Sequence, residues 1–229
     1  MKTVHLLILS AIAVFTLIAA GPDDRKAKKG GGAPVESAVV PAYPFNVWLC
    51  RPGADSVTAS VLAWQEMEGF ISFGESPDAM TRRTGPFQLS VGTPVNIVLD
   101  GLKPDTRYFY QFNHRSAGGE SAKDQIRSFH TQRKAGASFR FVMQADSHLD
   151  NNTDVRVYQQ TLANMLADKP DFMIDLGDTT MVDKFGQFFR RSESQYKAQR
   201  YYMGRIAHSV PIFMVLGNHD GERGSDPEM

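Results

Sequence analysis

The chain has 229 residues, of which 42% are hydrophobic and 22% are charged, a balance typical of a globular protein with one or two domains. Its 25 basic and 25 acidic residues give a formal net charge of zero, so the composition does not favour binding to nucleic acid or to an acidic membrane surface. The single cysteine, Cys50, excludes an internal disulfide framework and a cysteine-rich zinc site.

The first 21 residues have the layout of a secretory signal peptide. Lys2 provides a short positive start, residues 6–18 are almost wholly apolar, and small residues follow at 19–21. The apolar run is short for a membrane span, and no cysteine follows it that could carry a lipid. We therefore expect a secreted or periplasmic protein without a stable membrane anchor, and a retained N-terminal anchor is the alternative. Residues 22–43, rich in Gly, Pro and charge, are predicted to be a flexible linker.

Residues 44–132 contain short runs of alternating apolar and polar residues, which Gly, Pro and Asp interrupt. Six or seven strands within about ninety residues predict an all-β sandwich. The stretch Leu102–Phe112, LKPDTRYFYQF, resembles the corner before the sixth strand of fibronectin type III domains. In that corner a tyrosine hydroxyl bonds back to nearby backbone, and Tyr108 is the candidate for this role.

The pattern changes after a polar connector, and residues 138–229 are predicted to form part of an α/β domain. Three strand-like apolar runs alternate with two stretches of helical character, in the order 139–146, 154–169, 170–178, 192–209 and 210–218. This βαβαβ order is typical of a mostly parallel sheet. His208 ends the second helical stretch, where we expect it to place a favourable positive charge at a helix C-terminus.

Each of the three predicted strands ends in polar side chains. In chain order they are Asp146 and His148, then Asp178, then Asn218, His219 and Asp220. Because ligands bind outside the carboxyl ends of strands in open parallel sheets, we expect the three ends to form one site. Carboxylate and imidazole ligands suit a cation such as Mn, Fe or Zn. A carboxylate such as Asp178 can bridge two ions, and Asp220 could hold the ring nitrogen of His219, which would face the substrate.

The same residues carry a resemblance to the calcineurin-like metallophosphoesterases. Three blocks agree with that family in order and spacing: Asp146-Ser147-His148, Gly177-Asp178-Thr179-Thr180 and Gly217-Asn218-His219-Asp220. The preceding sandwich resembles the N-terminal fibronectin-like domain of purple acid phosphatases and their bacterial relatives. Together the two resemblances cover about residues 44–220. They imply a phosphoesterase with a four-layered αββα core and two metal ions.

The family's pattern also implies a role for each residue. Asp146 and His148 would bind one metal ion, Asp178 would bridge, Asn218 would bind the second ion, and His219 would be the general acid. The implied reaction is hydrolysis of phosphate monoesters by metal-activated water, as in acid phosphatases, with two divalent or trivalent ions of iron, manganese or zinc. A phosphodiesterase or nucleotidase is one alternative. A non-catalytic binding module, whose sandwich holds a glycan or a protein, is another.

The sequence departs from the family in two respects. His148 stands where purple acid phosphatases have glycine, and Met181 stands where they have a metal-bound tyrosine, so an iron-tyrosinate colour is not expected. The family's later histidine ligands are also absent, because the sequence stops at Met229, nine residues after Asp220. We therefore expect part of a longer protein that holds half of the αββα core and that, alone, hydrolyses phosphate esters poorly or not at all. The half sheet is expected to expose an unpaired apolar edge.

Overall fold

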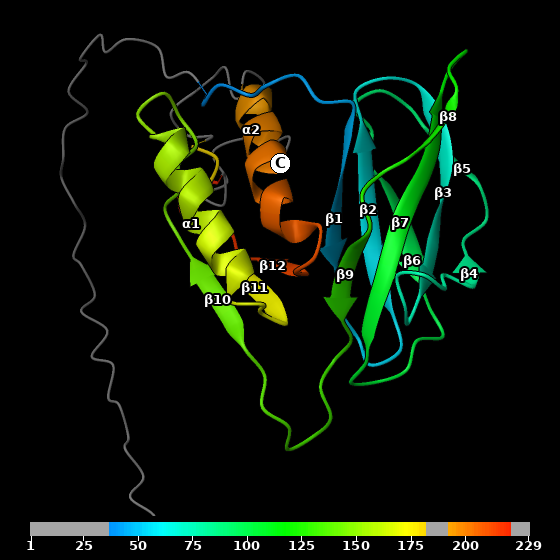
Figure 1. Ribbon diagram of the computed structural model, residues 1–229. Coiled ribbons are helices and arrows are strands. Elements are labelled where there is room, and N and C mark those ends of the chain that lie inside the picture. Colours follow the sequence, from blue (N-terminus) through cyan, green and yellow to red (C-terminus); the bar gives the residue numbers. More distant parts are fainter. Residues whose placement is uncertain (1–36, 182–191, 221–229) are drawn as a thin grey trace, which may run out of the picture. The chain divides into compact units, whose positions relative to one another are not determined.

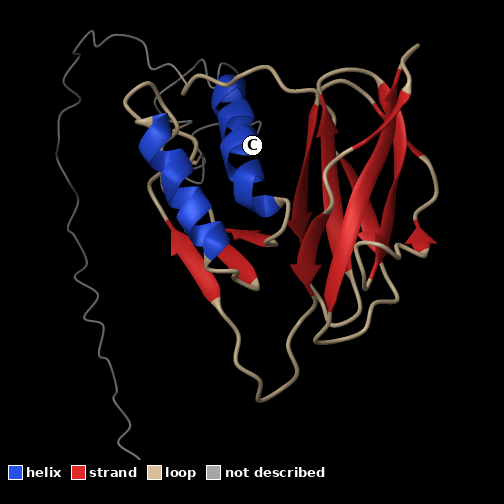
Figure 2. Ribbon diagram, viewed as in Figure 1, coloured by secondary structure: helices blue, strands red, loops and turns tan. Residues whose placement is uncertain are grey.

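The computed structural model describes residues 37–181 and 192–220, which all belong to the same structural unit (Figures 1 and 2). The predicted signal peptide, 1–21, and most of the predicted linker, 22–43, lie outside the described residues. No helix in the described part of the chain is long and apolar enough to cross a membrane.

The first half of the described chain consists of strands. They are β1 (Phe45–Cys50), β2 (Val57–Ala63), β3 (Met67–Gly74), β4 (Arg82–Arg83), β5 (Phe87–Leu89), β6 (Val95–Leu99), β7 (Arg107–Ser116), β8 (Ser121–Lys123) and β9 (Arg127–His130). The six longer strands coincide with the alternating runs in the sequence. The short strands β4, β5 and β8 were not predicted, because two or three residues are too few to show an alternating pattern.

These strands form two sheets that share one core. β1, β2 and β6 lie in one sheet, and β3, β4, β5, β7, β8 and β9 form the other. Leu49 of β1, Ile71 of β3 and Phe112 of β7 are fully buried in the same apolar cluster. The hydroxyl of Tyr108 accepts a hydrogen bond from the backbone N–H of Lys103 at 3.0 Å, which confirms the predicted corner. Kinship of this sandwich with fibronectin type III domains stays a prediction.

The second half follows the predicted strand–helix alternation. Its elements are β10 (Phe141–Gln144), α1 (Val155–Ala167), β11 (Phe172–Asp175), α2 (Glu193–Ala207) and β12 (Ile212–Met214). The strands pair in parallel in the order β10-β11-β12. Both helices lie on the same side of this sheet, where Leu162 and Met203 pack with Met173 and Ile212 (Figure 1). The alternation of the strands thus sends Met173 and Asp175 toward the helices.

The opposite face of the parallel sheet is exposed and apolar in the described residues. Phe141 and Met143 of β10 are 42% and 52% exposed, and Phe213 of β12 is 45% exposed. Phe172 stacks on Phe141, with ring centroids 5.4 Å apart, and meets the ring of Phe213 edge-on at 5.7 Å. Because parallel sheets in proteins normally have both faces covered, this face has the character of an interior surface.

Within the described residues this sheet is paired on the β12 side, and its terminal strand β10 carries the exposed Phe141 and Met143 of the expected apolar edge. Ile212 pairs in parallel with Cys50 of β1, and the sheet continues as β10-β11-β12-β1-β2-β6. The sequence could not show this pairing, which joins residues more than 160 positions apart. The exposed apolar surface lies on a face of the sheet, while β10 is its terminal strand.

Helix α2 is fastened to the sandwich through Arg200. Its guanidinium donates hydrogen bonds to Asn46 Oδ1 at 2.8 Å and to the carbonyl of Ser60 at 2.6 Å, and it lies over the ring of Trp48. The Arg200 carbonyl accepts from the Asn46 amide and from Trp48 Nε1. Burial lowers the pKa of Arg200 to about 10, and the polar atoms of β1 and β2 satisfy the guanidinium.

His208 follows the last turn of α2, but it does not carry the predicted positive charge. Burial, with the nearby Arg127 charge as a smaller cause, lowers the pKa of His208 to about 4. Its backbone carbonyl accepts a hydrogen bond from the hydroxyl of Tyr110 in β7. The imidazole is therefore neutral at pH 7, and the end of α2 is secured by this contact with the sandwich.

Candidate metal centre

Three loops follow the carboxyl ends of β10, β11 and β12, and we call residues 145–149, 177–180 and 217–220 the strand-end loops. The backbone N–H of Asp146 donates to the carbonyl of Gly177 at 3.0 Å, and that of His148 donates to the carbonyl of Asp178 at 3.1 Å. The backbone N–H of His219 donates to Asp178 Oδ1 at 2.8 Å. The structure thus brings the predicted blocks into direct contact.

Asp146 and His148 face each other within the first loop. His148 Nε2 lies 3.7 Å from Asp146 Oδ1, and the two side chains are 37% and 68% exposed. Both groups are therefore accessible to a cation from solvent. The pairing of one imidazole with one carboxylate is a donor set that Mn, Fe and Zn accept.

The backbone of these loops is held in a sparsely populated conformation. Asp146, His148 and Asp178 have φ values of 57°, 55° and 54°, and Leu149 has 48°. Such left-handed conformations are uncommon outside glycine, and they cluster at functional sites when the surroundings enforce them. Their concentration in two adjoining loops supports a functional role for this end of the sheet.

Two glycines permit the close approach of the second and third loops. Gly177 has a φ of 94°, and a Cβ built on it would lie 2.1 Å from the backbone nitrogen of Gly217. A Cβ on Gly217 would lie 2.3 Å from Asp178 Oδ1. Any side chain at either position would therefore separate the loops or displace the carboxylate of Asp178.

The carboxylate of Asp220 is buried between the same loops. Oδ2 accepts hydrogen bonds from the backbone N–H groups of Asp178 and Gly217, at 2.6 and 2.9 Å. Oδ1 accepts from the N–H groups of Thr179 and Thr180, at 3.1 and 2.7 Å, and from the Thr180 hydroxyl at 2.9 Å. Both oxygens of Asp220 thus bind the second and third loops together, a role that the sequence did not suggest.

His219 and Asn218 stand beside this buried carboxylate. Both residues are half-buried, and the ring of His219 meets the ring of His148 edge-on, with centroids 6.4 Å apart. The third loop therefore places an imidazole next to the predicted ligands of the first loop.

Residues 139–229 match the family model described as calcineurin-like phosphoesterase. This part of the chain is a calcineurin-like phosphoesterase domain. The chain is also similar to purple acid phosphatase 23 of Arabidopsis thaliana, with 21% identity over an alignment of 144 residues, which covers 56% of this chain and 30% of that protein.

Two solved structures share the fold. The chain is similar to the structure of PhoD, with a TM-score of 0.51 and 15% identity over 80% of this chain and 40% of that one. It is also similar to purple acid phosphatase PPD1 of yellow lupin, Lupinus luteus, with a TM-score of 0.54 and 16% identity over 76% of this chain and 35% of that one. The chain thus spans between 30% and 40% of the length of these relatives.

A buried network lies beneath the second loop of the phosphoesterase domain. Asp175 is fully buried, and its carboxylate accepts hydrogen bonds from the Gly177 N–H at 3.0 Å, the Thr179 hydroxyl at 2.9 Å and the Gln144 amide at 2.7 Å. The same Gln144 amide donates to the hydroxyl of Tyr158 in α1 at 2.8 Å. Burial raises the pKa of the Asp175 carboxyl, against the lowering effect of these hydrogen bonds.

Asp175 was missed as a supporting residue, although the sequence contains a signal for it. In the strand Phe172–Asp175 it shares the inward face with Met173, so the alternation places a carboxylate in the core. A buried carboxylate requires hydrogen-bond donors, and the polar groups nearest in sequence are the Gly177 N–H and the Thr179 hydroxyl.

The donors fit a metal ion in kind, but they are few. Asp146, His148 and Asp178 provide carboxylate oxygens and an imidazole nitrogen, which are the donors that such ions bind. Among residues 37–181 and 192–220, however, no three His, Cys, Asp or Glu side chains lie close enough together to hold one ion. Because tight protein sites usually use three or four protein ligands, these donors are expected to hold a metal weakly.

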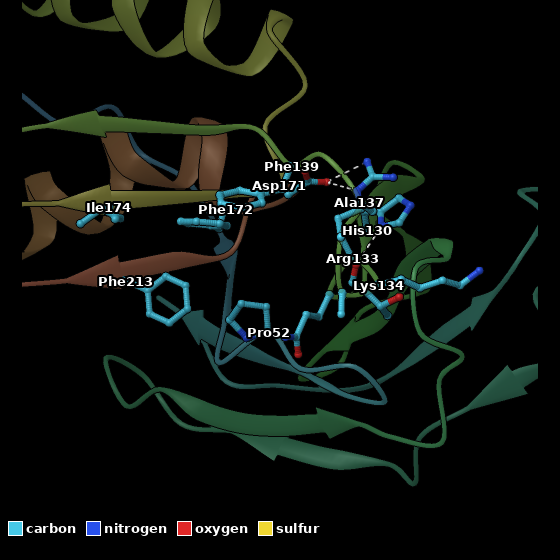
Figure 3. A pocket seen from close by; sticks show the side chains of 14 residues that line it. Pro52, His130, Arg133, Lys134, Ala137, Phe139, Asp171, Phe172, Ile174 and Phe213 are labelled. Atoms are coloured by element: carbon cyan, nitrogen blue, oxygen red, sulfur yellow. Dashed lines mark hydrogen bonds and ion pairs between the residues drawn. The ribbon is translucent and has the colours of Figure 1, made fainter. Parts of the chain in front are cut away.

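A cavity of about 590 Å³ lies away from the strand-end loops, beside the amino ends of β10 and β11 (Figure 3). Phe172 and Phe213 line it, so its wall continues the exposed apolar face of the sheet. The cationic residue Arg133 is paired with Asp171 at 2.9 Å and with Asp105 at 3.4 Å. Its charge is thus balanced within the protein, and the predicted site residues lie at the opposite end of the strands.

Proposed function

We propose that the protein is an exported phosphoesterase that hydrolyses phosphate monoesters in a metal-dependent reaction at the strand-end loops. The convergence of Asp146, His148 and Asp178 at one end of a parallel sheet is the observation that supports this function. Membership of residues 139–229 in the calcineurin-like phosphoesterase family supports the choice of phosphate esters as substrates. The apolar stretch at 6–18 supports export.

Asp146 and His148 would hold one metal ion, Asp178 would lie between two ions, and Asn218 would contribute its carbonyl oxygen to the second. When bound, such ions lower the pKa of a coordinated water and polarise phosphoryl oxygens. Iron, manganese and zinc all accept these donors, and elemental analysis of the protein distinguishes among them.

His219 would hold a proton for the oxygen of the leaving alcohol. Its half-buried imidazole stands beside His148, so it lies next to the proposed ligands. General acid catalysis of this kind typically contributes about 10²–10⁴-fold to the rate. Asp220 contacts the second loop, and its role in orienting the ring of His219 stays a prediction.

We further propose that residues 44–132 form a fibronectin type III-like domain and that residues 138–229 hold the first half of an αββα core. The corner at Tyr108 supports the first assignment. The helix-covered sheet with its exposed apolar opposite face supports the second, because a second sheet would complete the core on that face.

The test is hydrolysis of p-nitrophenyl phosphate and bis-p-nitrophenyl phosphate by the chain with added Mn²⁺. Single-turnover conditions are needed, because the few donors predict poor metal affinity and slow turnover. We expect the monoester to be cleaved faster, and Asp146→Asn and Asp178→Asn to abolish Mn²⁺-dependent cleavage. Hydrolysis that persists in both variants would contradict the proposed site. Faster diester cleavage would favour a phosphodiesterase, and no Mn²⁺ binding at all would favour a binding module.

The role of His219 is tested by the leaving group. An alkoxide leaves slowly without a proton, whereas a nitrophenolate leaves readily, so His219→Gln should slow an alkyl phosphate much more than p-nitrophenyl phosphate. Asp178→Asn should slow both esters alike by removing metal. Equal slowing of both esters by His219→Gln, or loss of metal from it, would make His219 a ligand or a positioning group.

A further inference from the structure

The second and third strand-end loops exchange hydrogen bonds in both directions through two carboxylates. Asp178 lies in the second loop and accepts the backbone N–H of His219 from the third. Asp220 lies in the third loop and accepts the backbone N–H groups of Asp178, Thr179 and Thr180 from the second. Each loop therefore provides the anion that the amides of the other loop require.

We propose that Asp220 is a positioning residue that aims the carboxylate of Asp178 at the metal position. We call the reciprocal contacts between Asp178 and Asp220 the carboxylate lock. This inference rests on the proposed function only in treating Asp178 as a metal ligand. The lock itself consists of hydrogen bonds within the protein and does not depend on a bound metal.

The geometry of Asp220 favours a fixed position over a mobile one. Its side chain is buried, and its two oxygens accept five hydrogen bonds from four residues, all between 2.6 and 3.1 Å. Hydrogen bonds to an ionised carboxylate are stronger than those between neutral groups. Successive N–H groups that converge on one anion also form a rigid concave turn.

The lock explains how Asp178 keeps its unusual backbone conformation. A φ of 54° at a non-glycine residue persists only when the surroundings enforce it. The bond from the Asp178 N–H to Asp220 holds the backbone from one side, and Asp175 holds Gly177 and Thr179 from below. The N–H of His219 then donates to Asp178 Oδ1, which fixes the orientation of the carboxylate.

The lock also requires the two glycines at the contact between the loops. The Gly217 N–H is itself a donor to Asp220 Oδ2, and there is no room for a Cβ at Gly177 or Gly217. Residues that support a metal ligand from behind typically change metal affinity by about 10–100-fold when they are replaced. Asp220 should therefore behave as such a residue, although it holds Asp178 through the backbone.

The experiment compares Asp220→Asn with Asp220→Glu in the full chain. Asparagine would turn an NH₂ group toward backbone N–H donors, whereas glutamate keeps an acceptor at both oxygens. We expect Asp220→Asn to weaken Mn²⁺ binding, measured by electron paramagnetic resonance of free Mn²⁺, by about 10–100-fold. Hydrogen exchange at the amides of residues 178–180 should accelerate in the same variant, and Asp220→Glu should restore part of both properties.

Asp171→Asn is the matched control. The Asp171 carboxylate also accepts a backbone amide, from Arg140 at 2.9 Å, but it lies at the amino end of the same sheet. This variant should leave Mn²⁺ affinity and exchange at residues 178–180 unchanged. Should Asp220→Asn not fold, Thr180→Val carries the test, because it removes only the hydroxyl donor to Asp220. It should then accelerate exchange at the same amides.

The outcomes separate the lock from the proposed function. If Asp178→Asn weakens Mn²⁺ binding but Asp220→Asn changes neither affinity nor exchange at residues 178–180, the lock is wrong and the metal site stands. If Asp178→Asn leaves Mn²⁺ affinity unchanged, the metal site is wrong, whatever the exchange measurements show. If Asp171→Asn and Asp220→Asn lower Mn²⁺ affinity equally, the loss reflects a general decrease in stability, and the carboxylate lock is wrong.

Discussion

The two ends of the parallel sheet β10-β11-β12 are built differently. At the carboxyl ends, polar loops with left-handed residues touch through backbone amides and the carboxylates of Asp178 and Asp220, of which Asp220 is buried. At the amino ends, stacked rings line a cavity, and Arg133 is neutralised by Asp171 and Asp105. At the carboxyl ends, residues in left-handed conformations hold polar side chains in place. At the amino ends, the charged side chains pair with one another.

This difference teaches where function and stability reside in the domain. Strained loops contribute little to stability, but they can bring polar side chains from neighbouring strands to the same end of a sheet. The amino ends and helix α2, through Arg200 and His208, hold the sheet to the sandwich. Substitutions at the two ends should therefore have separable effects on metal affinity and on stability.

Gly217→Ala should have the largest effect, because its Cβ would lie 2.3 Å from Asp178 Oδ1 and 2.4 Å from the Asp178 nitrogen. The loops must separate, so we expect Mn²⁺ affinity to fall by more than about 100-fold, beyond the range typical of a lost supporting contact. Gly85→Ala is the control, since nothing lies within 4 Å of its Cβ. Titration with Mn²⁺ decides the matter, and unchanged affinity in Gly217→Ala would show that close contact between the loops is not required.

His208 predicts a pH dependence that belongs to the amino end of the sheet. Its folded pKa of about 4 lies below the ordinary value, so between about pH 6.5 and 4 the unfolded chain binds a proton that the folded chain does not. Stability should therefore fall as pH drops through this window, by on the order of 2–3 kcal/mol. Urea unfolding at several pH values should show a smaller fall for His208→Gln, and an identical fall would mean that His208 is not the group responsible.

Arg133→Met should produce a smaller loss, about 1–2 kcal/mol, because it removes the cation that pairs with the half-buried Asp171 and leaves Asp105 with the more distant Lys134 at 3.8 Å. The pair is partly exposed, so solvent screens much of the interaction. Mn²⁺ affinity should not change. A clear loss of affinity in Arg133→Met would break the distinction between the two ends.

The smallest effect on stability is expected from Phe213→Ser, because this side chain is 45% exposed on the apolar face of the parallel sheet that the helices do not cover. Its replacement should change the free energy of unfolding by less than about 1 kcal/mol, but it should reduce self-association of the chain. Sedimentation at several protein concentrations measures this effect. Val98→Ser, at an exposed position of β6, is the control, and equal behaviour of the two variants would show that this apolar face does not drive association.

Local patterns were enough to predict most of the fold. The alternation in residues 45–50 and 57–63 and the helical spacing at 154–169 specify elements whose neighbours in sequence are also their neighbours in space. The hydroxyl bond of Tyr108 was predictable for the same reason, since it spans five residues. The pairing of Cys50 with Ile212 was not, because it depends on how two distant segments pack.

The site shows the same limit at the level of side chains. Residue type and strand order predicted that Asp146, Asp178 and His219 would meet, and the structure confirms that their loops touch. The partners of Asp220 could not be predicted, because a carboxylate next to a histidine can turn either way. Only the tertiary fold shows that the backbone N–H groups of residues 178–180 donate hydrogen bonds to the Asp220 carboxylate. The neutral state of His208 likewise depends on burial, which its place at a helix end does not reveal.

Paramagnetic broadening of the amide signals of the chain during titration with Mn²⁺ shows whether the three strand-end loops bind metal as one site. The amides of His148, Asp178 and His219 should broaden first and together, and Asp178→Asn should remove the effect. Broadening that begins instead near Asp105 and Asp171 at the amino ends, or that persists at the loops in Asp178→Asn, would contradict the claim.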